Sequence, residues 1–305
     1  MTRALVSWTI AALLCTASVA IAQQAFKTPE EAAGALVSAA KAGDMKALVT
    51  VLGPDGEDIV SSGDNVADAA TREKFVAAYD AKHQIAMEGD NKAIVVIGGE
   101  DFPLPIPLIR KGAMWSFDTI AGREEILLRR IGKNELDAIQ ASLAYVDAQN
   151  EYAEKDRTGA GVNTYAQRVV SRPGKKDGLY WPTSPGDDPS PLGEFIAQAT
   201  AQGYRVGGEP TPYHGYYFRI LTRQGPAAPG GELDYIVRGN MIGGFALVAY
   251  PAEYRNSGVM TFLVSHTGTV FQKDLGPGTA KLAERMSSFN PDRTWQVVSD
   301  TAPLQ

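Results

Sequence analysis

Cysteine is nearly absent from this chain of 305 residues, because Cys15 is its single cysteine. Cys15 lies within an apolar N-terminal segment that we expect to be removed, which leaves a mature chain without cysteine. Thiol nucleophiles, disulfide bonds and cysteine-based metal sites are thereby excluded from the mature protein. A lipoprotein needs a small residue directly before its modified cysteine, whereas Leu14 occupies this position, so the sequence predicts no lipid anchor.

An excess of positive charge is also missing, since 29 Lys and Arg stand against 35 Asp and Glu, a formal net charge of −6. This balance gives no general attraction to phosphate groups or anionic lipid, so we expect no nucleic-acid partner. The charge is unevenly distributed: residues 23–157 carry 15 basic and 23 acidic side chains, whereas residues 158–305 carry 13 and 12. The change in composition predicts two domains.

The first 22 residues have the three parts of a secretory signal peptide. Arg3 supplies the positive charge, residues 4–14 are mostly apolar, and the small residues at 20–22 match a cleavage site. We expect cleavage after Ala22 and a periplasmic or secreted protein with no membrane span after cleavage. An uncleaved anchor is the alternative, because residues 4–22 reach the roughly 17–25 residues that a spanning helix needs.

Residues 23–122 predict helices followed by antiparallel hairpins. Thr28 and Pro29 mark the start of the first helix, because threonine caps helices and proline suits the first helical position. Further helices are predicted to end at residue 52 and to cover 68–80, and strands to cover 84–88, 92–97 and 113–118. This order is typical of a small α+β domain.

Every second residue from Pro103 to Pro107 is proline. Alternate residues of a strand direct their N–H groups to the same neighbour, so these prolines remove the donors of one edge only. The pattern predicts an edge strand over 103–108, with Leu104, Ile106 and Leu108 on its buried face. A proline-rich recognition segment is the alternative interpretation.

Residues 122–157 show the longest helical pattern, with Leu136, Ile139, Leu143 and Val146 at spacings of three and four. This apolar seam is barely two heptads long, so we expect the helix to pack on its own sheet rather than form a coiled coil. Strands are predicted beyond it at 216–222, 233–237, 245–250, 259–265 and 269–272, with short helices at 191–202 and 279–286.

These elements define an α+β fold class, with N-terminal helices and antiparallel hairpins followed by a long amphipathic helix packed on a C-terminal antiparallel sheet. We divide the chain into a signal peptide (1–22), an N-terminal domain (23–122) and a C-terminal domain (123–305).

Four segments, at 115–118, 145–152, 173–182 and 257–262, resemble an uncharacterised family of exported bacterial proteins that is known only as a domain of unknown function. The resemblance covers most of the mature chain and implies location and architecture, without a mechanism. The N-terminal half is similar to the cone of cystatin-like and ketosteroid-isomerase-like domains. The C-terminal half is similar to the globular domain of type II secretion pseudopilins.

Some pseudopilins bind calcium in the loop that corresponds to residues 156–161, where Asp156 is the single carboxylate. Calcium takes six to eight oxygen ligands, so we expect no metal there. The histidines His83, His214 and His266 form no metal-ligand or catalytic motif. The sequence therefore predicts no catalytic residues, no metal and no cofactor.

Two places carry residue types suited to binding. The loop with Arg172, Lys175, Lys176, Tyr180 and Trp181 combines three cations with aromatic rings, a composition that suits an anionic or saccharide partner. Aromatic side chains that tuck onto the long helix would explain the same residues without a partner.

His214 stands in the aromatic run 213–218 and is a second candidate for ligand contact, with core packing as the alternative. The leading hypothesis is a non-catalytic exported protein that contacts an envelope protein or a cell-wall component. A small-ligand protein that uses the concave sheet of the N-terminal cone is the second hypothesis, and an envelope hydrolase is the third. The sequence leaves the oligomeric state open.

Overall fold

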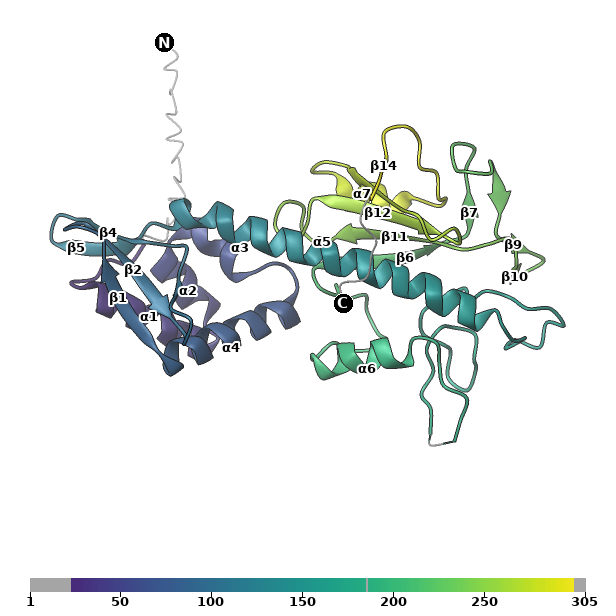
Figure 1. Ribbon diagram of the computed structural model, residues 1–305, viewed down its shortest axis with the longest axis horizontal. Coiled ribbons are helices and arrows are strands. Elements are labelled where there is room, and N and C mark those ends of the chain that lie inside the picture. The colour runs from purple at the N-terminus through teal and green to yellow at the C-terminus, as the bar shows by residue number, and fades with distance from the viewer. Residues whose placement is uncertain (1–22, 185, 299–305) are drawn as a thin grey trace, which may run out of the picture.

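The computed structural model describes residues 23–184 and 186–298. The predicted signal peptide, and the anchor that is its alternative, therefore lie outside the described residues. Two lobes lie at either end of one long helix, and both combine helices with antiparallel sheets (Figure 1). The predicted α+β class is confirmed. Within the described ranges, no helix has both the length and the apolar character needed to cross a membrane.

Four α-helices and a short 3-10 helix begin the N-terminal lobe. They are α1 (Pro29–Ala42), α2 (Met45–Leu52), the 3-10 helix η1 (Pro54–Gly56), α3 (Glu57–Val60) and α4 (Asn65–Ala81). The predicted start of α1 is confirmed: the Thr28 hydroxyl accepts from the Glu31 amide at 3.1 Å, and the Glu31 carboxylate accepts from the Lys27 amide at 2.9 Å. The first bond satisfies an amide that the first helical turn would otherwise leave unpaired, and the second ties the residue before the cap to the same turn.

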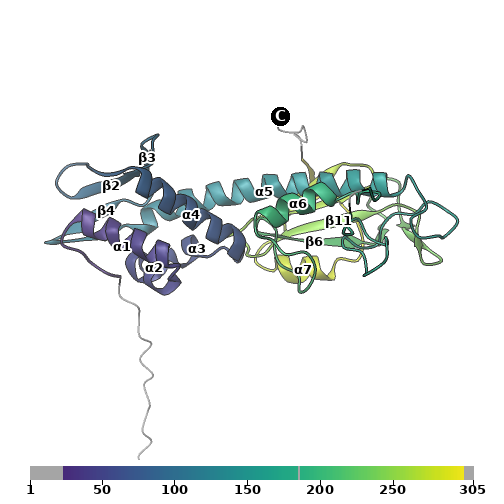
Figure 2. The same ribbon diagram turned by 90° about the horizontal axis from the view of Figure 1, so that it is seen from below.

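The N-terminal sheet has the order β1-β2-β4-β5, with β3 paired to β2. The strands are β1 (His83–Met87), β2 (Lys92–Ile97), β3 (Phe102–Pro103), β4 (Leu108–Lys111) and β5 (Met114–Phe117). Side chains from β2, β4 and β5 form one buried cluster with α1 and α2, which lie against the sheet (Figure 2). The burial of Ala93, Val95 and Leu108, each at most 1% exposed, shows that this face is packed.

The expectation of one edge strand over 103–108 is wrong in part. The segment splits into β3 and the start of β4, and β4 pairs on both sides, with β2 and β5. Gly122 of the long helix comes so close to the break that a Cβ atom there would lie 2.5 Å from the Pro105 carbonyl oxygen. The apolar face was predicted correctly, because Ile106 and Leu108 are buried and Leu104 packs against the same cluster.

The long helix α5 (Thr119–Tyr152) joins the two lobes (Figures 1 and 2). Ile139 and Val146 of the predicted seam are buried, but Leu136 is 52% exposed. Leu143 packs against the same core as Ile139 and Val146, so the predicted face is right except at Leu136. Alanines and tyrosines widen the buried stripe, namely Ala138, Ala141, Tyr145, Ala148 and Tyr152. Small side chains let the helix approach the sheet closely, while the tyrosines fill the space between them.

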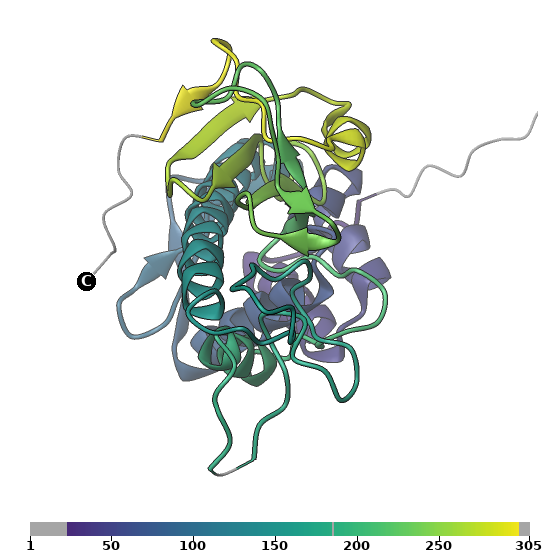
Figure 3. The same cartoon turned by 90° about the vertical axis from the view of Figure 1, so that its right-hand side faces the viewer.

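The C-terminal lobe is built on a five-stranded antiparallel sheet in the order β14-β13-β12-β11-β6. Its strands are β6 (Tyr216–Leu221), β11 (Ala246–Pro251), β12 (Met260–Ser265), β13 (Val270–Asp274) and β14 (Gln296–Val297). The helices are α6 (Gly193–Ala201) and α7 (Thr279–Arg285). The sheet and α6 lie on different sides of α5 (Figures 1 and 3).

The strand expected over 233–237 is divided into two short pieces. Two-stranded ribbons form from β7 (Arg223–Gln224) with β8 (Leu233–Asp234), and from β9 (Ile236–Val237) with β10 (Asn240–Met241). Tyr235 stands between β8 and β9, where its side chain is fully buried and its hydroxyl donates to Gln224 Oε1 at 2.9 Å. The kink that buries Tyr235 interrupts the strand.

Candidate functional site

The loop with the predicted binding residues folds onto α5. Trp181 is 5% exposed, and its ring lies 5.2 Å from Lys176 Nζ and 5.3 Å from the guanidinium carbon of Arg157. The Tyr152 hydroxyl of α5 donates to the Lys176 carbonyl at 2.6 Å. Two cations over one indole ring are favourable contacts within the chain. This geometry corresponds to the interpretation in which the aromatic rings tuck onto the long helix.

The other residues of this loop are engaged to different degrees. Arg172 binds Asp177 through its backbone amide at 2.9 Å and through Nε at 2.6 Å. Burial works to raise the pKa of Asp177, but the hydrogen bonds and charge of Arg172 outweigh it and hold the pKa below its ordinary value. Tyr180 is half-buried, whereas Lys175 is exposed at the loop tip. Lys175 is therefore the cation of this loop that is best placed to meet a partner.

His214 lies away from that loop, at the junction of the two lobes. It occupies a two-residue turn: the Tyr213 amide donates to the Tyr216 carbonyl at 2.8 Å, and the Tyr216 amide donates back at 3.1 Å. His214 has φ 48° and Gly215 has φ 74°, the left-handed pair that suits a tight hairpin of right-twisted strands. The turn points the imidazole toward α5.

The imidazole of His214 is held on both sides. Its Nδ1 bonds the carboxylate of Asp137 on α5, and its Nε2 lies 2.8 Å from Gln202 Oε1. The Tyr204 and Tyr213 rings flank it. Burial works to raise the pKa of Asp137, but the hydrogen bonds from His214 and Lys133 outweigh it and lower the pKa. The hydrogen bond between Nδ1 and the Asp137 carboxylate therefore contributes to holding this turn against α5.

Asp64 is the most deeply buried acid of the junction, at 1% exposed. Its Oδ1 caps α4 by accepting from the Val66 and Ala67 amides, both at 3.1 Å. Its Oδ2 accepts from the Tyr204 hydroxyl and the Gly215 amide, both at 2.9 Å. Four donors and the helix N-terminus compensate for the loss of water around the carboxylate. One side chain thus satisfies its own helix and binds the other lobe.

The hydroxyl of Tyr204 connects Asp64 to the His214 turn. It donates to Asp64 and accepts from the His214 amide at 3.2 Å. Burial raises the pKa of Tyr204 above its ordinary value, and the negative charge of Asp64 raises it further. Tyr204 therefore stays protonated and keeps donating to Asp64 across the physiological pH range.

Arg130 of α5 is the cation of the junction. Its guanidinium donates to the Asp58 carbonyl and to Asn256 Oδ1, each at 2.6 Å, and also to the Ile59 carbonyl. Asn256 in turn donates to the Ser61 carbonyl at 2.8 Å. Burial works to lower the pKa of Arg130, yet an arginine remains charged at any physiological pH. The guanidinium therefore joins the end of α3, the helix α5 and the loop before β12.

The geometry of the junction restrains groups rather than freeing them for reaction. Both ring nitrogens of His214 are engaged, and Asp64 accepts four hydrogen bonds. In the part of the chain that the structure describes, no group of three or more His, Cys, Asp or Glu could hold a metal ion. Asp156 belongs to the loop that was compared with the calcium loop of pseudopilins. Its carboxylate accepts hydrogen bonds from four backbone amides of its own loop, those of residues 158–161.

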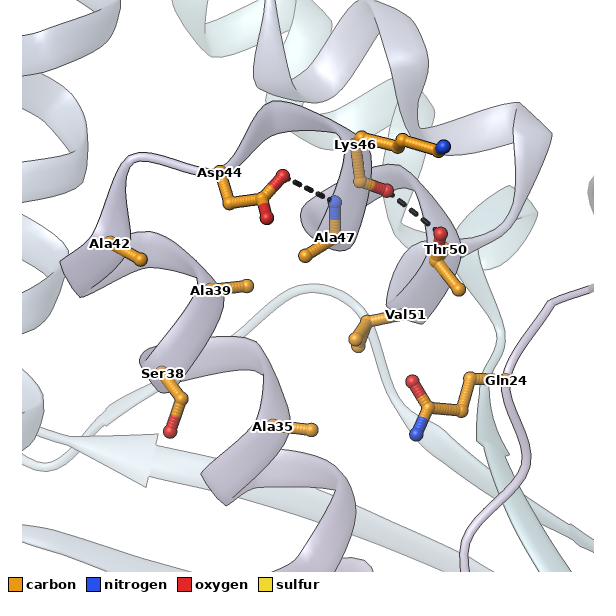
Figure 4. Close-up of a pocket in the computed structure, with 10 residues that line it drawn as sticks. All are labelled: Gln24, Ala35, Ser38, Ala39, Ala42, Asp44, Lys46, Ala47, Thr50 and Val51. Carbon is orange, nitrogen blue, oxygen red and sulfur yellow. Dashed lines mark hydrogen bonds between the residues drawn. The ribbon is translucent and has the colours of Figure 1, made fainter.

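Two open hollows lie on the N-terminal lobe, outside its core. One, of about 520 Å³, lies between α1 and α2, and four of its ten lining residues are alanines; Asp44 and Thr50 within it bond their own helix (Figure 4). The other, of about 570 Å³, is lined by residues of α2, α3 and α4, including Met45 and Arg72. Neither hollow is lined by strand residues, and the sheet face toward the helices is filled by side chains.

The sequence predictions missed most of the junction. Of its residues, His214 alone had been singled out, whereas Asp64, Asp137, Arg130 and Tyr204 had not. Asp64 could have been found, because it directly precedes α4 as an N-cap, although we predicted that the helix begins at residue 68. Its hydrogen bonds to the other lobe could not be predicted from the residues next to it in the sequence.

These features define a two-lobed α+β protein in which a shared helix and a buried polar junction connect the lobes. The model of the family described as "Protein of unknown function (DUF2950)" matches residues 23–298, and the chain belongs to this family. The predicted membership of a family of unknown function is thereby confirmed. No curated protein and no solved structure matches the chain. The likenesses to cystatin-like domains and to pseudopilins stay predictions.

Proposed function

We propose that the protein is an exported, non-catalytic protein of the bacterial envelope, which acts through contacts with another envelope protein or with a cell-wall component. The observation that carries this proposal is the junction, in which Asp64 and Arg130 each bind both lobes. Lobes joined by a small interface move relative to each other by default. A buried polar network restricts that movement and presents two surfaces in one orientation.

The polar character of the junction supports this role. Buried charges add little net stability compared with apolar residues of the same shape, and we propose that here they hold the two lobes to a defined geometry. Asp64, Tyr204 and His214 satisfy one another's donors and acceptors, so sliding one lobe past the other would leave buried groups unpaired. An orientation fixed in this way suits a protein whose role is to be bound at more than one place.

The C-terminal lobe offers the surface that we assign to the partner. Arg172, Lys175 and Lys176 are exposed in a loop that the Tyr152 hydroxyl of α5 holds at the Lys176 carbonyl. An anchored loop loses little freedom when it binds, which favours affinity. The exposed cations suit an anionic partner, such as an acidic envelope protein or the carboxylates of a cell wall.

Export and domain type support the same proposal. Residues 1–22 have the pattern of a Sec-type signal peptide, which supports a location in the periplasm or outside the cell. The sequence predicts a likeness of the two halves to cystatin-like and pseudopilin globular domains, two domain types often used for interaction. The alternative of a small ligand in the N-terminal cone has less support, because Val95, Leu108 and Phe117 fill the sheet face that it requires.

Co-sedimentation with purified cell-wall sacculi tests the cell-wall arm. We expect the protein to pellet with the sacculi without releasing soluble fragments, and Lys175→Glu to weaken pelleting. Lys281→Glu is the control, because Lys281 is an exposed lysine of α7. For the protein arm, a photocrosslinker at position 175 should trap one envelope protein, and the same probe at position 281 should not.

Turnover would contradict the proposal. If the protein releases fragments from sacculi and Asp137→Asn or His214→Gln abolishes this release, the His214–Asp137 pair serves catalysis and the hydrolase hypothesis replaces ours. Retention of residues 1–22 in the mass of the protein recovered from cells would contradict the export step.

A further inference from the structure

The N-terminal sheet has one open edge, the outer side of β1. The sheet order leaves β1 and β5 outermost (Figure 1). The edge of β5 is partly covered, because Phe26 and Trp115 exchange two backbone hydrogen bonds, at 2.8 and 2.7 Å. Across residues 23–184 and 186–298, β2 is the single strand that pairs with β1. The other side of β1 is therefore free to pair.

The backbone groups that face outward can be assigned from the ladder. The Glu88 amide donates to the Lys92 carbonyl and the Gly98 amide donates to the Lys82 carbonyl, both at 2.8 Å. In an antiparallel ladder, alternate residues bond the same neighbour, so the even-numbered residues of β1 face β2. His83, Ile85 and Met87 consequently direct their N–H and C=O groups away from the sheet.

Exposed edges of this kind are commonly blocked by proline, by a bulge or by an inward-pointing charge. The segment from His83 to Met87 contains none of these, and its pairing with β2 is regular along all five residues. Met87 also leaves 53% of its surface exposed. The groups that this edge can bind are therefore the N–H and C=O groups of another extended backbone.

We propose that the occupant is β1 of a second copy of this chain, paired antiparallel about a two-fold axis at Ile85. In this register Ile85 lies opposite Ile85 of the partner subunit, and His83 lies opposite Met87 of the partner subunit. All three residues of each copy then pair through their outward backbone groups. The two sheets become one continuous sheet, and the interface is isologous.

Charge favours this occupant over an arbitrary peptide. The same register places Lys82 opposite Glu88 of the partner subunit, and the symmetry repeats the contact. Residues directly opposite each other project on the same face of a sheet, so the two charges meet. Both side chains are exposed, at 47% and 53%, and each now makes a surface ion pair, with Asp101 and Lys92 respectively. A register shifted by two residues would lose both contacts.

Sedimentation velocity over a range of protein concentrations tests the proposal. We expect a reversible dimer. Lys82→Glu and Glu88→Lys should each raise the dissociation constant about tenfold, since each substitution changes two symmetry-related contacts of ordinary surface strength. The double variant Lys82→Glu/Glu88→Lys restores opposite charges and should return the dissociation constant close to that of the wild type. Lys41→Glu breaks a comparable surface pair, between Lys41 of α1 and Asp80 of α4, and should leave the dissociation constant unchanged.

A backbone variant gives independent evidence. Met87→Pro removes one outward N–H group and should abolish the dimer, whereas Met87→Thr keeps the group and should retain it. Circular dichroism checks that each variant is folded. A protein that stays monomeric at all concentrations would overturn the proposal. A dimer that Met87→Pro and both charge reversals leave unaffected, or one that the double variant fails to restore, would overturn it equally.

Discussion

The Tyr204 hydroxyl donates to Asp64 Oδ2 at 2.9 Å, across 140 residues of sequence and between the two lobes. The same carboxylate caps α4, so one ionised group serves local and tertiary structure together. A cap that also crosses the junction couples the stability of the first turn of α4 to the position of the other lobe.

Asp64→Ala should lower the free energy of unfolding by about 3 kcal/mol, because it removes a helix cap and leaves buried donors of Tyr204 and Gly215 unpaired. Asp44→Ala is the matched control: Asp44 caps α2 but is exposed, and its loss should cost about 1 kcal/mol. Urea unfolding of both variants measures the difference. Equal losses would show that the contacts across the junction contribute nothing.

Arg130→Met should cost about 2–3 kcal/mol, since it leaves the Asp58 and Ile59 carbonyls without their charged donor. Arg129→Met, one residue earlier on α5, removes a surface pair with Glu125 and a contact over the Phe102 ring, and should change stability by about 1 kcal/mol or less. Thermal and urea unfolding check the contrast. A neutral Arg130→Met would mean that water replaces the guanidinium at no cost.

Two glycines of α5 should respond to alanine with opposite signs. Gly122→Ala should destabilise the protein, because a Cβ atom would lie 2.5 Å from the Pro105 carbonyl oxygen. Gly132 has nothing within 4 Å of the same position, so Gly132→Ala should stabilise the protein by about 1 kcal/mol through helix propensity. Unfolding midpoints measure both effects, and an equal sign for the two would contradict the packing of α5 on the break between β3 and β4.

Acid should weaken the junction through Asp137. Its folded pKa is lowered below the unfolded value of about 3.9. The ionised carboxylate therefore stabilises the fold at pH values above the unfolded pKa, and this contribution is lost as the pH falls through the folded pKa.

Urea unfolding at pH values from 6 down to 2 should show this loss in the wild type, and a smaller loss in Asp137→Asn. Asp90→Asn, in an exposed turn of the N-terminal lobe, serves as the control and should follow the wild type. If the curve of Asp137→Asn runs parallel to that of the wild type, the contact with His214 does not depend on the charge of Asp137.

Elements set by local chemistry could be predicted from the sequence. Thr28 and Pro29 correctly predicted the start of α1. The segment from Lys92 to Ile97, which is apolar after the lysine, correctly predicted the bounds of β2. The predicted buried face of α5 is right at Ile139 and Val146 but wrong at Leu136, and the pattern of large apolar residues did not reveal the contacts made by alanine.

The candidate site could be predicted much less well. His214 drew attention because it stands among aromatic residues, but its partners Asp137 and Gln202 come from two other elements. Asp64 forms hydrogen bonds with residues of the second lobe, and no residue spacing in the sequence predicts these bonds. Tertiary hydrogen bonds of this kind follow from the packing of the lobes, which the local pattern does not determine.

The central claim is that the junction fixes the orientation of the two lobes. Residues 23–305 contain no cysteine, so spin labels can be placed at Asp90→Cys in one lobe and Thr267→Cys in the other without first removing native cysteines. Pulsed electron spin resonance should give one narrow distance distribution, which broadens when Asp64→Ala and Arg130→Met are added. A broad distribution without these substitutions, or a narrow one that they leave unchanged, would contradict the claim.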